Sequence, residues 1–233
     1  MKVQIWSDVM CPFCYIAKNN FEKAIEQLPF ANDIQVEWKS YQLDPELKEN
    51  SGSKTFGQYL MERKGFSAPQ TKQFLQQLTD MGQNSGVNFN HDRTFVANTF
   101  PAHKLLHLAK KAGKDNEMEE LLFRALFEDG KNIADTELLV SLAEQLGIER
   151  EMAKDVLSSD KFEYEVKQDF MEARNMGISG VPFFVLNDKY SVSGAQPVEA
   201  FVSALTQTYK ETVKPLENLG GNDKSCSADG CSL

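Results

Sequence analysis

Strand-like sequence occurs only near the two ends of this chain of 233 residues, and this distribution constrains its fold more than any other feature. Val3–Trp6 and Ile34–Trp38 alternate apolar and polar side chains, which is typical of strands. Between them lies a helical stripe of apolar residues that ends at Pro29. A strand–helix–strand unit of this length predicts two parallel strands joined by a right-handed crossover.

The stretch from about Ser53 to Met176 carries helical patterns and no strand patterns. Asp135 precedes one apolar stripe as a candidate N-cap, while Gly113 and Gly147 follow two of the stripes as natural stops. The predicted helices are Phe56–Lys64, Ala68–Gly82, Thr99–Ala112, Met118–Phe127, Asp135–Leu146, Glu149–Leu157 and Phe162–Met176.

Strand signals return in Pro182–Leu186 and Tyr190–Ser193, with Asn187 and Asp188 as the turn between them. Pro197–Thr212 predicts a closing helix. The chain is therefore expected to divide into an α/β domain of residues 1–52 and 177–213, a helical insertion domain of residues 53–176, and a flexible tail of residues 214–233 that holds a C-x4-C pair.

Composition limits the partners and the location of the chain. Hydrophobic residues at 41% and a length of 233 residues allow a large apolar core without disulfide or metal crosslinks. The net charge of -9, without a dense Lys/Arg face, argues against nucleic acid. No apolar run approaches the roughly 18 residues that span a membrane, and the first residues do not resemble a signal peptide. We therefore expect a cytoplasmic protein that has neither nucleic acid nor a membrane as its partner.

Cys11 and Cys14 form a C-x-x-C pair at the start of a predicted helix and directly after a predicted strand. A helix N-terminus stabilises a thiolate through its unpaired N–H groups and its dipole. Two thiols one helical turn apart allow the second to displace a mixed disulfide formed by the first. We therefore predict that Cys11, at the exposed end, attacks and that Cys14 resolves. Half of a zinc site and two inert buried cysteines are the alternatives.

Gly180-Val181-Pro182 stands immediately before an apolar strand. A proline at the start of a strand can be an ordinary trans proline, which is common there. With Cys11 and Cys14 upstream, we expect instead a cis Val181–Pro182 bond that faces the cysteine pair, as at the corresponding place in the thioredoxin fold.

The chain contains three motifs in this order: SDVMCPFCYIAKNNFEKAI, NTFPAHKL and GISGVPFFVLNDKYSVSGAQP. Together they resemble the DsbA family, and their sequences are similar to those of its cytoplasmic FrnE-like branch. The resemblance covers residues from about 1 to 212. It implies an α/β thioredoxin fold with a large all-helical insertion between its β-α-β and β-β-α halves. It also implies dithiol–disulfide exchange or isomerisation on protein substrates.

The resemblance assigns expected roles to individual positions. Cys11, Cys14 and Pro182 are the expected catalytic residues. For His103, a packed or surface position without a role in the site is the alternative, because it is a lone histidine among leucines. The expected substrate-binding residues are Pro12, Phe13, Val181, Asn98, Thr99 and His103, and no metal site is expected.

The dipeptide between the cysteines departs from that of the strongly oxidising periplasmic members. They have Pro-His there, whereas this chain has Pro12-Phe13, and phenylalanine cannot donate to a thiolate as imidazole does. A carboxylate at Asp8, if close in space, would disfavour the thiolate further. We expect a reduction potential in the range of about -200 to -230 mV, well below the roughly -120 mV of a strong oxidant. This favours reduction or isomerisation over net oxidation.

Cys226 and Cys231 form a second pair, C-x4-C, in the tail. The FrnE-like branch sometimes carries such a pair, which implies an auxiliary redox centre that exchanges with Cys11. A tail without function, an adventitious metal-binding pair and a four-cysteine zinc site built from both pairs are the alternatives.

Two other classes of protein are alternatives to the interpretation as a cytoplasmic oxidoreductase or isomerase. The kappa-class glutathione transferases and 2-hydroxychromene-2-carboxylate isomerases share the fold, the insertion and the Val-Pro element, but typically have serine in the active turn. The other is a zinc-bound non-catalytic or chaperone-like binding protein. An oxidoreductase here needs no resident cofactor. Its expected partners are disulfide-containing protein substrates and an electron donor, either a small thiol such as glutathione or a thioredoxin-type protein.

Overall fold

The computed structural model describes residues 1–48, 54–212, 226–227 and 230–231. Its α-helices are α1 (Pro12–Glu26), α2 (Phe56–Lys64), α3 (Ala68–Ser85), α4 (Phe100–Lys111), α5 (Asp115–Phe123), α6 (Thr136–Gln145), α7 (Arg150–Ser158), α8 (Glu163–Asn175) and α9 (Val198–Thr212). Its strands are β1 (Lys2–Ser7), β2 (Gln35–Ser40), β3 (Phe183–Leu186), β4 (Tyr190–Ser193), β5 (Cys226–Ser227) and β6 (Gly230–Cys231). A short 3-10 helix, η1 (Ala31–Asp33), and a π-helical turn, η2 (Arg124–Glu128), also occur.

A four-stranded mixed sheet forms the centre of the fold, with the strand order β2-β1-β3-β4. β1 and β2 are parallel, with Val3 opposite Val36, because α1 carries the chain back across the sheet between them. β3 is antiparallel to β1, with Phe183 opposite Trp6, and a tight turn leads into antiparallel β4. This topology confirms the expected β-α-β and β-β-α halves with helices inserted between them.

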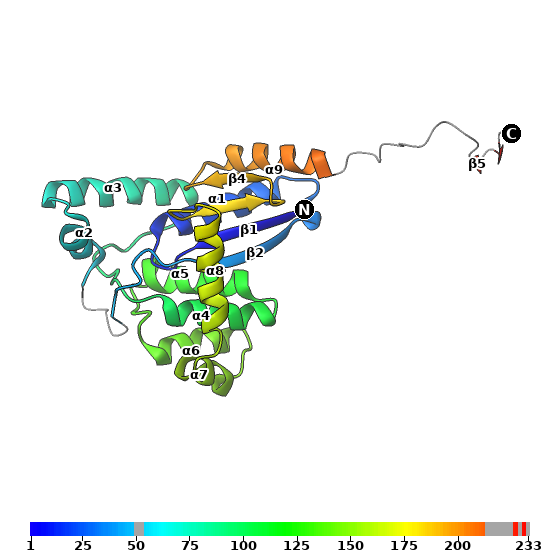
Figure 1. The fold of residues 1–233 in the computed structure, drawn as a ribbon. Helices are drawn as coiled ribbons and strands as arrows, with labels where there is room; N and C mark the ends of the chain where they lie inside the picture. Colours follow the sequence, from blue (N-terminus) through cyan, green and yellow to red (C-terminus); the bar gives the residue numbers. More distant parts are fainter. Residues whose placement is uncertain (49–53, 213–225, 228–229, 232–233) are drawn as a thin grey trace.

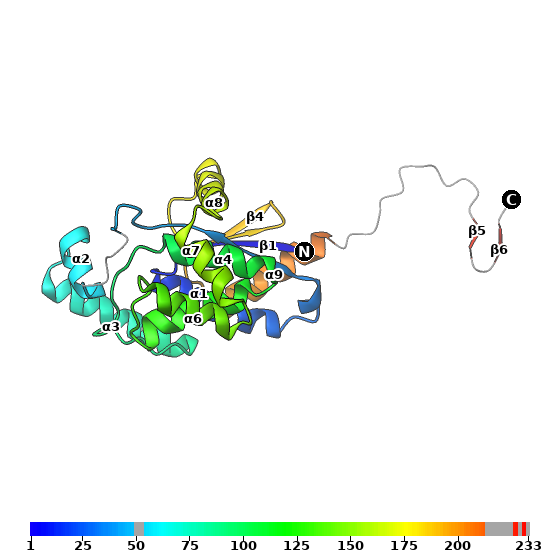
Figure 2. The same cartoon turned by 90° about the horizontal axis from the view of Figure 1, so that it is seen from below.

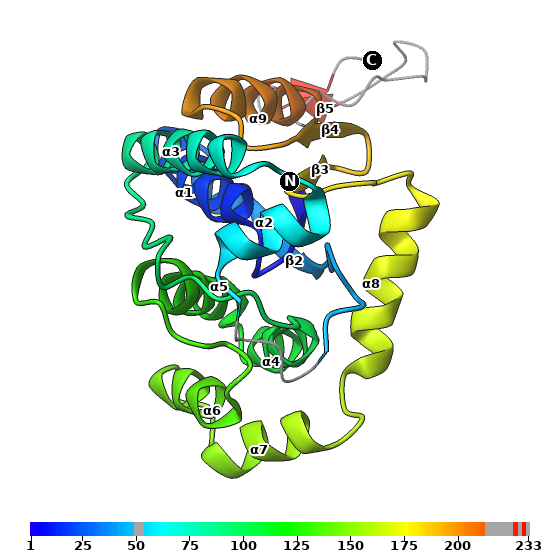
Figure 3. The same ribbon diagram turned by 90° about the vertical axis from the view of Figure 1, so that its left-hand side faces the viewer.

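Helices α1 and α9 cover one face of the sheet, and α8 lies on the other (Figure 3). Because side chains alternate along a strand, Ile5 of β1 and Phe184 of β3 point into the core beneath α1 and α9. Phe184 packs there against Phe21 and Phe201, with ring centroids 5.2 Å and 4.7 Å away. This core holds α1 on the sheet and thereby sets the position of its N-terminus.

The opposite face of the sheet binds α8 through both apolar and polar contacts. Trp6 packs against Ala173 of α8. The indole N–H of Trp6 donates to the backbone oxygen of Asp169 at 3.0 Å. The Asp169 carboxylate accepts in turn from the backbone N–H of Ser40 at 2.8 Å. These contacts join α8 to the end of β1 and to the end of β2.

Helices α4 to α7 stack beyond the β2 edge of the sheet (Figure 1). Their inward faces form an apolar cluster that includes Leu105, Leu122 and Leu139. The same cluster contains Cys11 and Cys14. The inserted helices therefore pack directly against the cysteine pair.

Helices α2 and α3 project together at one end of the sheet (Figure 2). Thr55 and Ser67 cap them, and each accepts from the backbone N–H three residues further on. Gly86 follows α3 with a φ of 84°, a left-handed conformation that glycine adopts without strain. The apolar faces of both helices pack around Met10 and Phe13, so this pair of helices flanks the active turn.

The predicted helices agree with the observed ones to within a few residues, except for one. The pattern predicts a helix over Met118–Phe127, whereas α5 begins at Asp115 and passes at Arg124 into the π-helical turn η2. Residues 125–127 of this turn are buried. The predicted N-cap is confirmed, because the Asp135 carboxylate accepts from the backbone N–H two residues later at 2.9 Å.

The expected domain boundaries after residues 52, 176 and 213 stay predictions. One apolar cluster joins the two sides of the first boundary, because it contains Tyr15 of the α/β domain together with residues of helices α4 to α7. Most of the expected tail, residues 214–233, lies outside the described residues. Within it, β5 and β6 pair antiparallel and place Cys226 opposite Cys231. In the described part of the chain, no helix combines the length and the apolar character needed to cross a membrane.

Phe184→Ala tests the core beneath α1. We expect it to lower the free energy of unfolding by about 3–5 kcal/mol, because it opens a cavity between Phe21 and Phe201. Urea unfolding followed by circular dichroism measures the change. Tyr164→Ala, at an exposed position of α8, is the control and should change stability by less than about 0.5 kcal/mol. A cost below about 1 kcal/mol for Phe184→Ala would contradict this packing.

Candidate active site

The cysteine pair lies at the junction between β1 and α1. Cys11 is the N-cap of α1, with φ of -93° and ψ of 110°, and Pro12 occupies the first helical turn. A proline there has the right φ for a helix and sacrifices no hydrogen bond. Cys11 therefore stands where the helix begins. Cys14 lies one turn further in, and its backbone N–H donates to the Cys11 backbone oxygen at 3.0 Å.

Both cysteines are free thiols, and both are buried, with 3% of Cys11 and 1% of Cys14 exposed. The prediction that Cys11 lies at an exposed end of the turn is therefore wrong. The reason is that the inserted helices and the segment at Val181 pack over the turn from two sides. The two thiols differ in their place on the helix rather than in their contact with solvent.

The Val181–Pro182 peptide bond is cis, as expected. The thiol of Cys11 donates to the backbone oxygen of Val181, with Sγ and O separated by 3.5 Å. This contact joins residues that are 170 positions apart. The antiparallel pairing of β1 with β3 brings them together, because Cys11 follows β1 and Pro182 precedes β3.

Cys14 has the environment of a thiol that stays protonated. Burial raises the pKa of the Cys14 thiol well above its ordinary value of 9.0, and the neighbouring Cys11 raises it further. Hydrogen bonds with the Ser7 side chain and with the backbone of Asp8 act in the opposite direction. A sheltered, protonated thiol next to an attacking one suits the resolving role.

Glu119 is a residue that the sequence analysis did not single out. Its Oε1 accepts from the Ser7 hydroxyl at 2.5 Å. Only 1% of Glu119 is exposed, and burial raises the pKa of its carboxyl from the ordinary 4.5 to about 7, although the Ser7 hydrogen bond and His103 lower it. A signal existed: Glu119 lies between Met118 and Leu122, on the inward side of a predicted helix.

His103 lies fully buried, at 0% exposure, in the same neighbourhood. Its Nε2 is 3.5 Å from Oδ1 of Asp8. The Asp8 carboxylate accepts from the backbone N–H groups of Met10 and Leu43 at 3.3 Å and 2.7 Å. Its effect on the thiolate stays a prediction. A substrate contact for His103 stays a prediction, and its burial argues against that contact.

Asn98 and Thr99 connect the start of α4 to the segment after β2. Asn98 Nδ2 donates to the backbone oxygen of Leu47 at 2.6 Å, and its Oδ1 accepts from the Gln42 side chain at 3.0 Å. The Thr99 hydroxyl lies 3.4 Å from the same Gln42 amide. Both residues are buried. These contacts describe a structural junction, and their role in substrate binding stays a prediction.

Phe13 and Val181 are half-buried beside the cysteine pair, whereas Pro12 is buried. The Phe13 ring meets Phe74 of α3 edge-on, with centroids 6.1 Å apart. Phe74 in turn meets Phe66 at 5.6 Å. A row of three aromatic rings, all half-buried, therefore leads from the active turn along α3.

Two further predictions concern metal binding and the cysteine pair of the tail. Among the described residues, no group of three or more His, Cys, Asp or Glu side chains could hold a metal ion. Cys226 and Cys231 lie opposite each other on the backbone of β5 and β6. Their auxiliary redox role stays a prediction.

Fold and site together define a thioredoxin-fold protein with a C-x-x-C dithiol. Residues 2–206 match the family model of the DSBA-like thioredoxin domain, and the chain belongs to this family. The probable DsbA oxidoreductase SCO1869 from Streptomyces coelicolor is 35% identical and has a TM-score of 0.88, over 100% of this chain and 99% of that one. The uncharacterized protein YwbO of Bacillus subtilis (strain 168) is 27% identical over 216 residues, which are 90% of this chain and 98% of that protein.

Two more distant structures share the fold. One is a 2-hydroxychromene-2-carboxylate isomerase, 18% identical with a TM-score of 0.67, over 91% of this chain and 98% of that one. The other is the cytosolic disulfide reductase DsbM from Pseudomonas aeruginosa, 16% identical with a TM-score of 0.63, over 91% of this chain and 100% of that one. At these identities the likeness concerns the fold alone.

Glu119 should make the stability of the fold depend on pH. Its pKa is about 7 in the folded protein and near the ordinary 4.5 in the unfolded chain, so the folded state binds more protons between these values. The stability that neutral Glu119 contributes is therefore complete below about pH 4.5 and is lost as the pH rises through about 7.

Glu119→Gln should remove this dependence. We expect the free-energy difference between wild type and variant to change by about 3 kcal/mol between about pH 4.5 and about pH 8, in favour of the variant at high pH. Urea unfolding at a series of pH values measures it. Glu117→Gln, at an exposed position of the same helix, should show no such trend. Parallel wild-type and Glu119→Gln curves would contradict the prediction.

Proposed function

We propose that this chain catalyses thiol–disulfide exchange on protein substrates, with Cys11 as the attacking thiol and Cys14 as the resolving thiol. The observation that carries the proposal is the 3.5 Å contact between Cys11 Sγ and the Val181 oxygen. It places a thiol at a helix N-terminus beside backbone groups that would pair with an extended peptide. Membership of the DSBA-like family supports the proposal.

The reaction begins when the Cys11 thiolate attacks a substrate disulfide and one substrate sulfur leaves as a thiolate. A mixed disulfide then joins Cys11 to the substrate. Cys14 loses its proton and attacks the Cys11 sulfur, so that the second substrate sulfur leaves and a Cys11–Cys14 disulfide forms. Two electrons pass from the dithiol to the substrate. In isomerisation, a substrate thiol attacks the mixed disulfide instead, and Cys11 leaves without net oxidation.

The row of rings beside the thiol suits an unfolded protein substrate. Phe13, Phe66 and Phe74 present half-buried aromatic surface next to the active turn. Apolar side chains that a misfolded protein exposes would pack there. The 3% exposure of Cys11 requires that the substrate segment displace part of the cover near Val181 when it binds.

We also propose that the protein acts in the cytoplasm and takes electrons from glutathione or a thioredoxin-type protein. Phe13 provides no hydrogen bond to the Cys11 thiolate, which favours a reductase or isomerase over a strong oxidant. The related fold from Pseudomonas aeruginosa is that of a cytosolic disulfide reductase and has been solved with GSH. Assignment to the FrnE-like branch rests on the sequence motifs alone.

An enzyme of the group formed by the kappa-class glutathione transferases and the 2-hydroxychromene-2-carboxylate isomerases is the second candidate, because a protein with the isomerase activity shares the fold. Two free thiols in the active turn favour disulfide exchange. Turnover of insulin reduction with a glutathione recycling system, measured against conjugation of glutathione to an electrophile, separates the two classes. Metal analysis of protein purified under reducing conditions tests the zinc-bound alternative.

Cysteine variants test the assigned roles. We expect Cys11→Ser to abolish insulin reduction, and Cys14→Ser to accumulate mixed disulfides because only resolution is lost. Limiting iodoacetamide should label Cys11 before Cys14, since burial raises the pKa of Cys14. Non-reducing electrophoresis and peptide mass spectrometry provide the readouts. Trapping by Cys11→Ser, or preferential labelling of Cys14, would reverse the assignment.

We further propose that Cys226 and Cys231 form a second redox pair that exchanges with Cys11. Their backbone positions lie opposite each other in the β5–β6 ladder, and Cα atoms of such pairs are about 4.5–5.5 Å apart, within the range that a disulfide bridges. Mild oxidation of Cys14→Ser protein should yield a Cys11–Cys226 or Cys11–Cys231 linkage within single chains, detected by mass spectrometry. Its absence, with full isomerase activity in protein truncated after residue 218, would leave the tail without this role.

A further inference from the structure

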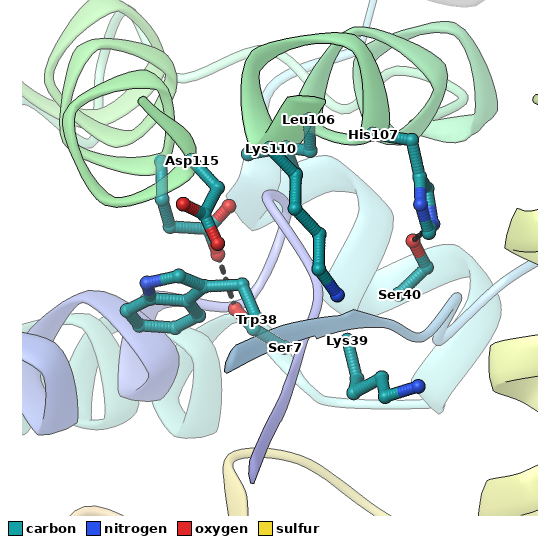
Figure 4. Close-up of a pocket in the computed structure, with 9 residues that line it drawn as sticks. Ser7, Trp38, Lys39, Ser40, Leu106, His107, Lys110 and Asp115 are labelled. Atoms are coloured by element: carbon teal, nitrogen blue, oxygen red, sulfur yellow. Dashed lines mark hydrogen bonds between the residues drawn. The ribbon is translucent and has the colours of Figure 1, made fainter. Parts of the chain in front are cut away.

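A hollow of about 700 Å³ opens at the surface beside α3. Clefts that bind small organic ligands usually measure about 300–1,000 Å³. The enclosed cavity between the sheet and helices α4 and α5, which Ser7, Ser40 and His107 line, is much smaller (Figure 4). Its volume of about 10 Å³ is close to the space that one water molecule needs. The hollow beside α3 therefore has room for an organic ligand, and the enclosed cavity does not.

Three separate segments of the chain line this hollow. Thr71, Leu75 and Thr79 belong to α3, at the four-residue spacing that places side chains on one face of a helix. Residues 88–92, which follow α3, and Glu128 of the π-helical turn η2 line it as well. Turns of this kind are frequent at functional sites. Polar and apolar side chains from distant parts of the sequence thus converge on one space, as they do in ligand sites.

Phe89 gives the hollow an aromatic wall that is held from behind. Its ring meets Phe127 edge-on and stacks on His91, with centroids 5.4 Å apart in each pair. Gly82 of α3 makes room for this ring, because a Cβ at that position would lie 2.6 Å from Phe89 Cε2. Glycine inside a helix is destabilising relative to alanine. The position of Phe89 is therefore kept at some cost to α3.

The hydrogen bonds around His91 fix the tautomer of its ring. The Thr79 hydroxyl donates to the backbone oxygen of Leu75 at 3.0 Å, and a hydroxyl has only one donor. His91 Nε2, 3.0 Å from Thr79 Oγ1, therefore carries the proton in that contact. Burial lowers the pKa of His91, although the Leu75 backbone and the charge of Asp92 act in the opposite direction. The ring is thus neutral at pH 7, and its Nδ1 is left as an acceptor.

Two carboxylates, Glu128 and Asp92, add further acceptors to the same hollow. Oε1 of Glu128 accepts from the Tyr15 hydroxyl and from the backbone N–H of Asn88, both at 3.3 Å. These two bonds hold the carboxylate in place from the side of the core. Its Oε2 lies 3.8 Å from Nε of the exposed Arg124, which is too far for a hydrogen bond. One oxygen of Glu128 is therefore left for a donor on a ligand.

A buried hydroxyl without a partner also belongs to the lining. Only 6% of Thr71 is exposed, and its Oγ1 has no hydrogen-bond partner among the described residues. Such a polar atom is costly to bury unless another group pairs with it. Among the lining residues that the structure describes, Lys72 has a positive charge, and Asp92 and Glu128 have negative charges. The lining is therefore rich in acceptors and negative on balance.

We propose that this hollow binds a small organic cation, a protonated amine carried on an apolar or aromatic body. Leu75 and Phe89 offer apolar surface to the body. An ammonium group has donors and no acceptor, which matches the oxygens of Glu128 and Asp92 and the Nδ1 of His91. An anion would instead meet two carboxylates. The inference goes beyond the proposed function, because neither cysteine of the active turn lines the hollow.

Titration with 2-phenylethylamine tests the proposal, with 2-phenylethanol as the neutral probe of the same body. We expect the amine to bind at least about 10-fold more tightly than the alcohol, because charge-assisted hydrogen bonds are the stronger ones. The anion 3-phenylpropionate should bind more weakly than the alcohol. The chain has three histidines, so NMR of protein with labelled histidine follows each ring. The signals of His91 should shift with the amine, and those of His103 and His107 should not.

Carboxylate variants locate the cation. Glu128→Gln should weaken binding of the amine at least about five-fold and leave binding of the alcohol within about two-fold of wild type. Asp92→Asn, at an exposed position, should weaken the amine about two- to three-fold, and it keeps the test open if Glu128→Gln does not fold. Asp129→Asn is the matched control, because Asp129 is next to Glu128 in the chain but pairs with Lys131 and does not line the hollow. It should bind both probes as wild type does.

Equal affinity for the amine and the alcohol would overturn the inference, and so would unchanged binding of the amine in both carboxylate variants. Amine-dependent shifts at His103 or His107 without a shift at His91 would place the amine elsewhere and overturn it as well. Cys11→Ser protein should bind the amine as wild type does. The binding test and the disulfide-exchange assays can therefore fail independently of each other.

Discussion

The pairing of β1 with β3 is the interaction on which the site depends. Trp6 lies opposite Phe183 in this ladder, so the turn that leaves β1 meets the segment that leads into β3. The result is the contact between Cys11 and Val181 across 170 positions. The aromatic core around Phe184 holds α1 on the same strands, and the N-terminus of α1 therefore stays in place against Val181.

Burial around the active turn is the second constraint, because it affects the free energy of folding. An acid with the pKa of about 7 that Glu119 has costs folding free energy at neutral pH, unlike the paired carboxylates at the surface. His103 is also fully enclosed. A fold that retains such groups gives up some stability, and the hydrogen bond from the Ser7 hydroxyl to Glu119 offsets part of that cost.

The inserted helices take part in the site from two directions. α4 and α5 contribute His103 and Glu119 beneath the active turn. α3, with the loop before it, contributes Phe74 and Phe66 beside the turn. The insertion closes over Cys11 as well, which explains how a thiol at the start of a helix is almost inaccessible in the free protein. Access of a substrate to Cys11 thus depends on elements outside the central sheet.

The sequence by itself determined the order of strands and helices, the cysteine pair at the start of α1 and the Val181–Pro182 segment before β3. Each of these depends on periodicity or on residues close in the chain, such as the Asp135 cap. The burial of Cys11, the enclosure of His103 and the link from Ser7 to Glu119 were decided only by the tertiary structure. Ser7 and Glu119 lie 112 positions apart, and no local pattern specifies which distant side chain a buried hydroxyl will meet.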